Sequence, residues 1–172
     1  LGDRGVRFGS DAASAVTSST ASLTIRGDDL EYNDLVFGFS NSLESTGGMV
    51  MESHSSSFSS AFDYENFDLD PSVSSVRIGK TTNTANVVIK DPVAMAGPIS
   101  IYGGDILLEE DLTSTLSGAD VLVKGRGDVE AVASRSFLTN NGDIVFWSNS
   151  DNSGVGSIKL GNDNVLNSSN GR

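Results

Sequence analysis

Apolar residues return at intervals of 22 and 23 residues in the C-terminal half of this 172-residue sequence, and this repeat constrains the fold more than any other feature. The repeat forms three columns, which are Ile99, Val121 and Ile144, then Ile106 and Val129, then Leu112 and Phe137. Around each column residue, apolar and polar positions alternate, which is typical of half-buried β-strands. Each repeat therefore carries about three short strands separated by corners rich in Gly, Asn and Asp, residues that favour tight or left-handed turns.

Repeats of about 20–50 residues indicate solenoids or propellers. Three short strands in about 22 residues suit one coil of a parallel β-helix, whereas a four-stranded propeller blade needs about twice that length. Stacked coils place like residues above like and bury them in continuous columns. We therefore predict an all-β parallel β-helix with coils of about 22–23 residues, in which Val165 continues the column of Ile99. An antiparallel β-sandwich also has short alternating strands, and it is the alternative.

Composition excludes several classes of protein. Ser, Thr and Asn occupy 51 of the 172 positions, and short polar side chains are poor in helix interiors, which argues against a helical bundle. The formal net charge of −12 argues against a nucleic-acid partner, which requires a positive surface. The sequence has no apolar stretch near 20 residues, so we expect no membrane insertion. With no cysteine, disulfides and zinc–thiolate sites are impossible.

The chain divides into two parts by regularity. Residues 1–70 form irregular coils with an acidic, Ser-rich insert near 53–70, and residues 71–172 form regular coils. The sequence begins at Leu1 without methionine and ends at Arg172 without a capping signal. We interpret it as one continuous solenoid fragment of a longer chain.

Three stretches of the second part carry a family resemblance. They read RIGKTTNTANVVI, AGPISIYGGDILLEEDL and TNNGDIVFWSNSDNSGVGSIKLG. They resemble repeat regions of large secreted, filamentous-haemagglutinin-like bacterial surface adhesins. The resemblance covers residues 76–171 and extends only loosely to the first half. It implies a right-handed parallel β-helix, export to the cell surface, and a stalk or adhesive role, and it supplies no catalytic residues.

Catalytic patterns are weak in this sequence. His54, the single histidine, lies beside a serine run without the G-x-S-x-G elbow of a Ser-His-Asp hydrolase. The acids Glu109, Glu110 and Asp111 could in principle serve glycoside cleavage. However, Asp105, Asp128 and Asp143 each follow a glycine and precede a strand, as corner residues at repeat-equivalent places do. We therefore expect no enzymatic activity.

Candidate binding residues are aromatic or acidic. Trp147, Tyr102 and Tyr64 could stack on sugars, or else pack between coils. Trp147 follows Phe146 in a strand, so if Phe146 is in the core Trp147 is exposed. Asp63, Glu65, Asp68 and Asp70 are hard oxygen ligands at close spacing that could hold calcium. Solvated carboxylates are the alternative, because the sequence has no EF-hand loop, and no other cofactor is expected.

These observations predict a structural role. We expect a stiff stalk or presentation rod within a large exported cell-surface protein. Its partners would be neighbouring repeats of the same chain, and surface glycans or other cells are further candidates. A polysaccharide-binding or polysaccharide-cleaving β-helix protein is the alternative.

Overall fold

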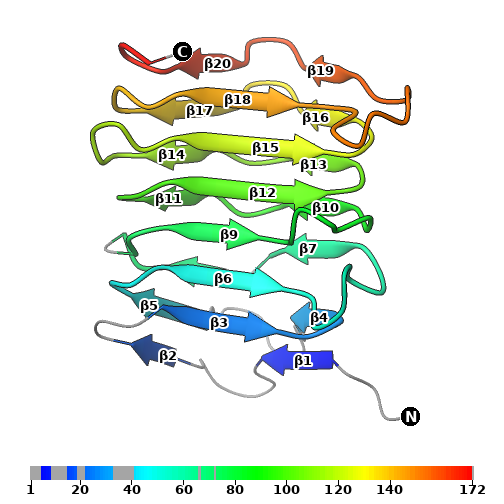
Figure 1. Ribbon diagram of the computed structural model, residues 1–172. Coiled ribbons are helices and arrows are strands. Elements are labelled where there is room, and N and C mark those ends of the chain that lie inside the picture. The colour runs from blue at the N-terminus through cyan, green and yellow to red at the C-terminus, as the bar shows by residue number, and fades with distance from the viewer. Residues whose placement is uncertain are drawn as a thin grey trace.

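The computed structural model describes the backbone of residues 5–8, 15–18, 22–32, 41–65, 67–71 and 73–171. Side chains are described for the same residues apart from 5–8, 15–18, 31–32, 41–45 and 68. Short strands stack in coils from the N-terminal to the C-terminal end (Figure 1). Every described strand pairing is parallel, which excludes the antiparallel sandwich. The chain runs forward along one face and returns behind it as it rises, so the solenoid is right-handed (Figure 1).

The first face is a six-stranded parallel sheet. In stacking order its strands are β3 (Leu23–Arg26), β6 (Met49–Glu52), β9 (Val76–Ile78), β12 (Ile99–Gly103), β15 (Val121–Gly125) and β18 (Ile144–Trp147). The register pairs Ile99 with Val121 and Val121 with Ile144. The first predicted column is therefore confirmed.

The second face holds a five-stranded sheet, made of β7 (Phe62–Tyr64), β10 (Val87–Ile89), β13 (Ile106–Leu108), β16 (Val129–Ala131) and β19 (Ile158–Leu160). A two-stranded sheet of β1 (Gly5–Phe8) and β4 (Asp29–Tyr32) lies at its N-terminal end (Figure 1). The register pairs Ile106 with Val129, as the second column predicts.

The third face is also made of two sheets. One contains β2 (Ala15–Ser18), β5 (Asn41–Ser45) and β8 (Phe67–Leu69), and the other contains β11 (Val93–Met95), β14 (Leu112–Ser114), β17 (Ser136–Thr139) and β20 (Val165–Asn167). Leu112 pairs with Phe137, which confirms the third column. Val165 pairs with Ser136, so the prediction that it continues the column of Ile99 is wrong.

The segment near 53–70 also departs from its description as an insert. Its second half supplies β7 and β8, which pair in register with β10 and β5. The excursion is confined to the Ser-rich corner between β6 and β7, and this corner is tied to the coil before it. The backbone N–H and hydroxyl of Ser55 both donate to Oδ1 of Asp28, at 2.6 and 2.7 Å.

Inward-facing residues form one continuous core. Ile78, Ile101 and Val123 stack in the first face and are fully buried. Several aromatic residues lie in the N-terminal part of the core, where the Phe58 and Phe62 rings stack with centroids 5.1 Å apart. Burial of these columns is the main favourable contribution to folding, at roughly 25 cal/mol per Å² of apolar surface.

Candidate functional site

An aromatic and cationic column stands on the outward side of the first face. Tyr102, Lys124 and Trp147 occupy equivalent positions of β12, β15 and β18, because Tyr102 pairs with Lys124 and Lys124 with Trp147. We call these three residues the Tyr102–Trp147 column. Phe146 packs against the core, with its ring edge-on to Phe137 at 5.0 Å. Trp147 consequently points outward and is 48% exposed, as the alternation predicts.

The column combines a cation with two aromatic rings. Lys124 Nζ lies 3.9 Å from the centroid of the Trp147 ring, a cation–π contact. Tyr102 and Trp147 are two strand spacings apart, about 9.6 Å. The neighbouring outward column holds Leu122 and Val145, and Val145 is 39% exposed. This part of the sheet can offer aromatic and aliphatic surface beside one positive charge.

The structure places Tyr64 elsewhere. Its side chain is fully buried, its ring packs 5.4 Å from that of Phe67, and its hydroxyl donates to the Phe67 carbonyl at 3.2 Å. Tyr64 occupies an inward position of β7, so it cannot stack on a ligand at the surface. It is removed from the set of surface candidates.

The acidic residues proposed as calcium ligands lie on different faces. Asp63 and Glu65 flank Lys90, whose Nζ lies 2.5 Å from Asp63 Oδ2 and 3.3 Å from Glu65 Oε2. The hydrogen bond to Asp63 raises the pKa of Lys90, and the nearby charge of Glu65 adds to this effect. A protonated lysine therefore occupies the position that a cation would take between the two carboxylates.

The other two acids belong to the third face. Asp68 is in β8, where its side chain lies outside the described residues, and Asp70 follows that strand. Among the side chains that the structure describes, no group of three or more His, Cys, Asp or Glu residues is arranged to hold a metal ion. Asp63 and Glu65 therefore act in a lysine-centred ion pair that joins β7 to the chain after β10.

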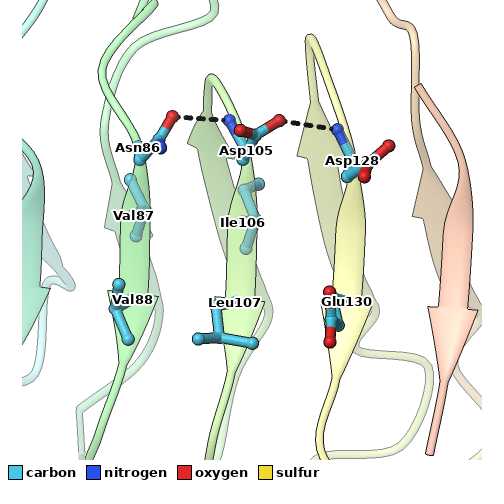
Figure 2. Close-up of a pocket in the computed structure, with 8 residues that line it drawn as sticks. All are labelled: Asn86, Val87, Val88, Asp105, Ile106, Leu107, Asp128 and Glu130. Atoms are coloured by element: carbon cyan, nitrogen blue, oxygen red, sulfur yellow. Dashed lines mark hydrogen bonds between the residues drawn. The ribbon is translucent and has the colours of Figure 1, made fainter. Parts of the chain in front are cut away.

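A shallow groove of about 280 Å³ crosses the outward side of β10, β13 and β16 (Figure 2). Its floor has Val88, Leu107 and Glu130 in register. At its edge, Asn86 Oδ1 accepts the N–H of Asp105 at 2.9 Å, and Asp105 Oδ1 accepts the N–H of Asp128 at 2.9 Å (Figure 2). The polar atoms along this edge are thus engaged in bonds between coils.

These corner acids form ladders along the solenoid axis. Asp128 Oδ1 continues the first ladder by accepting the N–H of Ser157 at 2.8 Å. A hydrogen bond from Lys159, then those from Ser157, lower the pKa of Asp128. Asp143 stands in a separate ladder, because its N–H donates to Asp120 Oδ1 at 2.8 Å. Asp105 and Asp128 are therefore repeat-equivalent, and Asp143 belongs to another corner.

The remaining candidates for catalysis are dispersed. Glu110 Oε2 pairs with Arg135 at 3.0 Å, and Asp111 Oδ1 accepts the N–H of Ser136 at 2.9 Å. His54 is exposed in the Ser-rich corner, where its carbonyl accepts a hydrogen bond from Lys80 at 3.3 Å. These contacts join successive coils and do not converge on one point.

An ionic triad centred on a buried carboxylate was not found from the sequence. Glu52 lies at an outward position of β6 but is 4% exposed, because Arg26 and Arg77 enclose it. Arg26 Nε donates to Glu52 Oε1 at 2.7 Å, and an Arg77 nitrogen donates to Oε2 at 2.8 Å. The sequence signal for this triad is the spacing of Arg26, Glu52 and Arg77 along the chain. Once the coils are aligned, this spacing places the three residues on successive coils.

The triad predicts a pH dependence of stability. Burial raises the pKa of Glu52, but hydrogen bonds and charges from Arg77 and Arg26 outweigh it, so the pKa lies below its ordinary value of 4.5. Because the folded pKa is the lower one, the stabilisation is present above about pH 4.5 and is lost as pH falls through the folded value. We expect Glu52→Gln to lower the free energy of unfolding by about 2 kcal/mol at neutral pH. The variant should also lose less stability than the unsubstituted protein as the pH falls into the acid range.

Urea unfolding at several pH values measures both effects. Glu110→Gln is the matched control, because its pair with Arg135 is about one third exposed on each side and exposed pairs contribute little. Equal pH profiles for Glu52→Gln and the unsubstituted protein would contradict this account.

Comparisons with known proteins add no family to these observations. A scan against models of protein families finds no match, and searches of curated proteins and of solved structures find none either. Within the described residues, no helix has the length and apolar character needed to cross a bilayer. The β-solenoid fold therefore rests on the strand pairing itself.

Proposed function

We propose that this chain is a structural segment of a large exported cell-surface protein, where it acts as a stiff stalk or presentation rod. The observation that carries the proposal is the continuity of contacts along the axis. Parallel ladders, apolar columns and corner ladders such as Asn86–Asp105–Asp128 all run from coil to coil. The resemblance to filamentous-haemagglutinin-like adhesins supports the same role.

The chemistry of the exterior is consistent with exposure to solvent on all sides. The net charge of −12 favours solubility and opposes nonspecific association. Several cations on the surface are paired with carboxylates of adjacent coils, as Lys90 is with Asp63 and Arg135 is with Glu110. Charge in this protein therefore serves cohesion between coils, and catalysis forms no part of the proposal.

An antibody raised against this chain tests the proposal in the source cells. Labelling of intact cells, with a denaturing-gel band many times larger than 17.9 kDa, is the expected result. A band near 17.9 kDa found inside the cells would overturn the stalk and the surface location together.

A second candidate function, glycan binding, is favoured by one specific observation. The fold brings Tyr102 and Trp147, which are far apart in the sequence, into one column with Lys124 between them. Aromatic rings stack on sugar rings, and Lys124 would favour a glycan that carries carboxylate or sulfate groups. An extended polysaccharide lying along the solenoid axis could contact all three side chains.

Affinity electrophoresis in gels containing neutral or acidic polysaccharides measures this binding. We expect Trp147→Ala to weaken retardation at least about tenfold, the loss of roughly 1.4 kcal/mol, and Lys124→Gln to weaken it for acidic glycans alone. Leu116→Ala is the control, because Leu116 is 58% exposed and lies outside the column. If the unsubstituted protein migrated equally in gels with and without each polysaccharide, glycan binding by this column would be excluded.

A further inference from the structure

A second cation lies in line with the Tyr102–Trp147 column. Arg77 is an outward residue of β9, and its guanidinium donates to the carbonyl oxygen of Gly79 at 2.8 Å. Gly79 follows β9 and lies one coil before Tyr102, since a Cβ on Gly79 would be 2.3 Å from the Tyr102 carbonyl oxygen. The Arg77 guanidinium therefore lies next to the position of the column at which glycine has no side chain.

Cations and aromatic rings alternate along this line. From β9 to β18 the order is Arg77, Tyr102, Lys124 and Trp147, one on each of four strands that lie one above another (Figure 1). Neighbouring strands are about 4.8 Å apart, so groups of the same kind recur about every 9.6 Å. Two successive sugars of an extended β-linked polysaccharide cover close to this distance. The period of the line therefore matches a polymer whose chemistry repeats at every second sugar.

The strands of the first face expose mainly positive charge. They contain three cations, Arg26, Arg77 and Lys124, and one acid, Glu52, which is buried. The side chains of Arg26 and Arg77 are 54% and 37% exposed, although both pair with Glu52. Trp147 is exposed although Lys124 lies over its ring. This face therefore offers accessible cations and an accessible ring to a polymer that carries negative charge.

We propose that the first face binds an extended polysaccharide with one carboxylate on every second sugar, its chain lying parallel to the solenoid axis. The carboxylates pair with Arg77 and Lys124, and the sugars between them lie against Tyr102 and Trp147. A guanidinium and an ammonium both form charge-assisted hydrogen bonds with carboxylates. The inference rests on glycan binding, the second candidate function above, and names the class of glycan.

The alternation also sets the specificity. A polymer with a carboxylate on every sugar would place every second carboxylate over an aromatic ring, whose face carries negative charge. A neutral polymer would leave both cations without a partner. A glycan with alternating charge avoids both losses, so it is the preferred ligand.

Affinity electrophoresis with three β-linked polysaccharides tests the proposal. The probes are hyaluronan, with a carboxylate on every second sugar, polymannuronate, with one on every sugar, and hydroxyethyl cellulose, with none. The test variant combines Tyr102→Lys with Lys124→Tyr, which keeps the composition and the net charge but moves the cation to the coil next to Arg77. The matched control combines Thr113→Leu with Leu138→Thr, an exchange between register-paired outward residues of the third face. Circular dichroism checks that both variants keep the β-solenoid fold.

The unsubstituted protein and the control should bind hyaluronan at least about tenfold more tightly than either other probe, and the test variant should lose this preference. Equal retardation by hyaluronan and polymannuronate, stronger retardation by hydroxyethyl cellulose, or a test variant that keeps the preference would overturn the alternating-charge ligand and leave glycan binding in place. If none of the three probes retarded the unsubstituted protein, glycan binding and this inference would both fall. The comparison of probes on the unsubstituted protein does not depend on the folding of any variant.

Discussion

Replacing Gly79 with alanine is expected to destabilise the protein by about 3 kcal/mol. Gly79 follows β9 with a φ of +76°, in the left-handed region. A Cβ at this position would lie 2.3 Å from the backbone carbonyl oxygen of Tyr102 in the next coil. The expected loss combines about 1–2 kcal/mol for a left-handed non-glycine residue with about 1–3 kcal/mol for overpacking against a backbone that cannot move freely.

Gly118→Ala separates these two contributions. Gly118 has a φ of +79°, but no heavy atom lies within 4 Å of a Cβ built there. Both variants therefore share the backbone strain, and only Gly79→Ala adds the clash between coils. Urea unfolding followed by circular dichroism should show Gly79→Ala as the less stable by about 1–3 kcal/mol. If the two variants were equally stable, the close approach of coils at Tyr102 would not be a determinant of stability.

The first face of the regular half could be predicted because its strands recur at nearly constant intervals. Ile99, Val121 and Ile144 stand in one column, as their spacing indicates. Val165 was misplaced because coil length changes at the C-terminal end. The corner between β18 and β19 is long, so Val129 pairs with Ile158, 29 residues later. A fixed interval therefore identifies columns only where the corners are of constant length.

The candidate site could be predicted only one strand at a time. Alternation beside Phe146 correctly places Trp147 on the surface, since neighbouring residues of a strand face opposite sides. The contact of Trp147 with Lys124 depends on register between coils, which a single strand does not contain. Tyr64 lay in a segment interpreted as an excursion, so its inward position in β7 went unrecognised.

Asn83→Ala is also expected to have a large effect, lowering the free energy of unfolding by about 3 kcal/mol. Asn83 is 1% exposed and lies in the corner between β9 and β10. Its Oδ1 accepts from Ser57 Oγ at 2.8 Å and from the N–H of Phe58 at 3.2 Å, and its Nδ2 donates to the Tyr102 carbonyl at 3.0 Å. One amide thereby joins three successive coils.

The magnitude follows from what alanine would leave behind. The buried N–H of Phe58 and the carbonyl of Tyr102 would both lose this partner, and each unsatisfied buried group costs about 1–3 kcal/mol. Asn86→Ala is the matched control in the same corner. Asn86 is exposed and its Oδ1 accepts one hydrogen bond, from Asp105. Its removal should therefore cost no more than about 1 kcal/mol.

Asn83→Asp tests whether donation by the amide is the essential part. At neutral pH the carboxylate keeps the acceptor for Phe58 but faces the Tyr102 carbonyl without a proton to donate. We expect a loss at least as large as that of Asn83→Ala, recovered in part at acid pH, where a protonated carboxyl can donate again. Unfolding curves at neutral and acid pH, corrected by those of the unsubstituted protein, measure the recovery. Little or no loss at neutral pH would mean that Asn83 holds the corner through its acceptor alone.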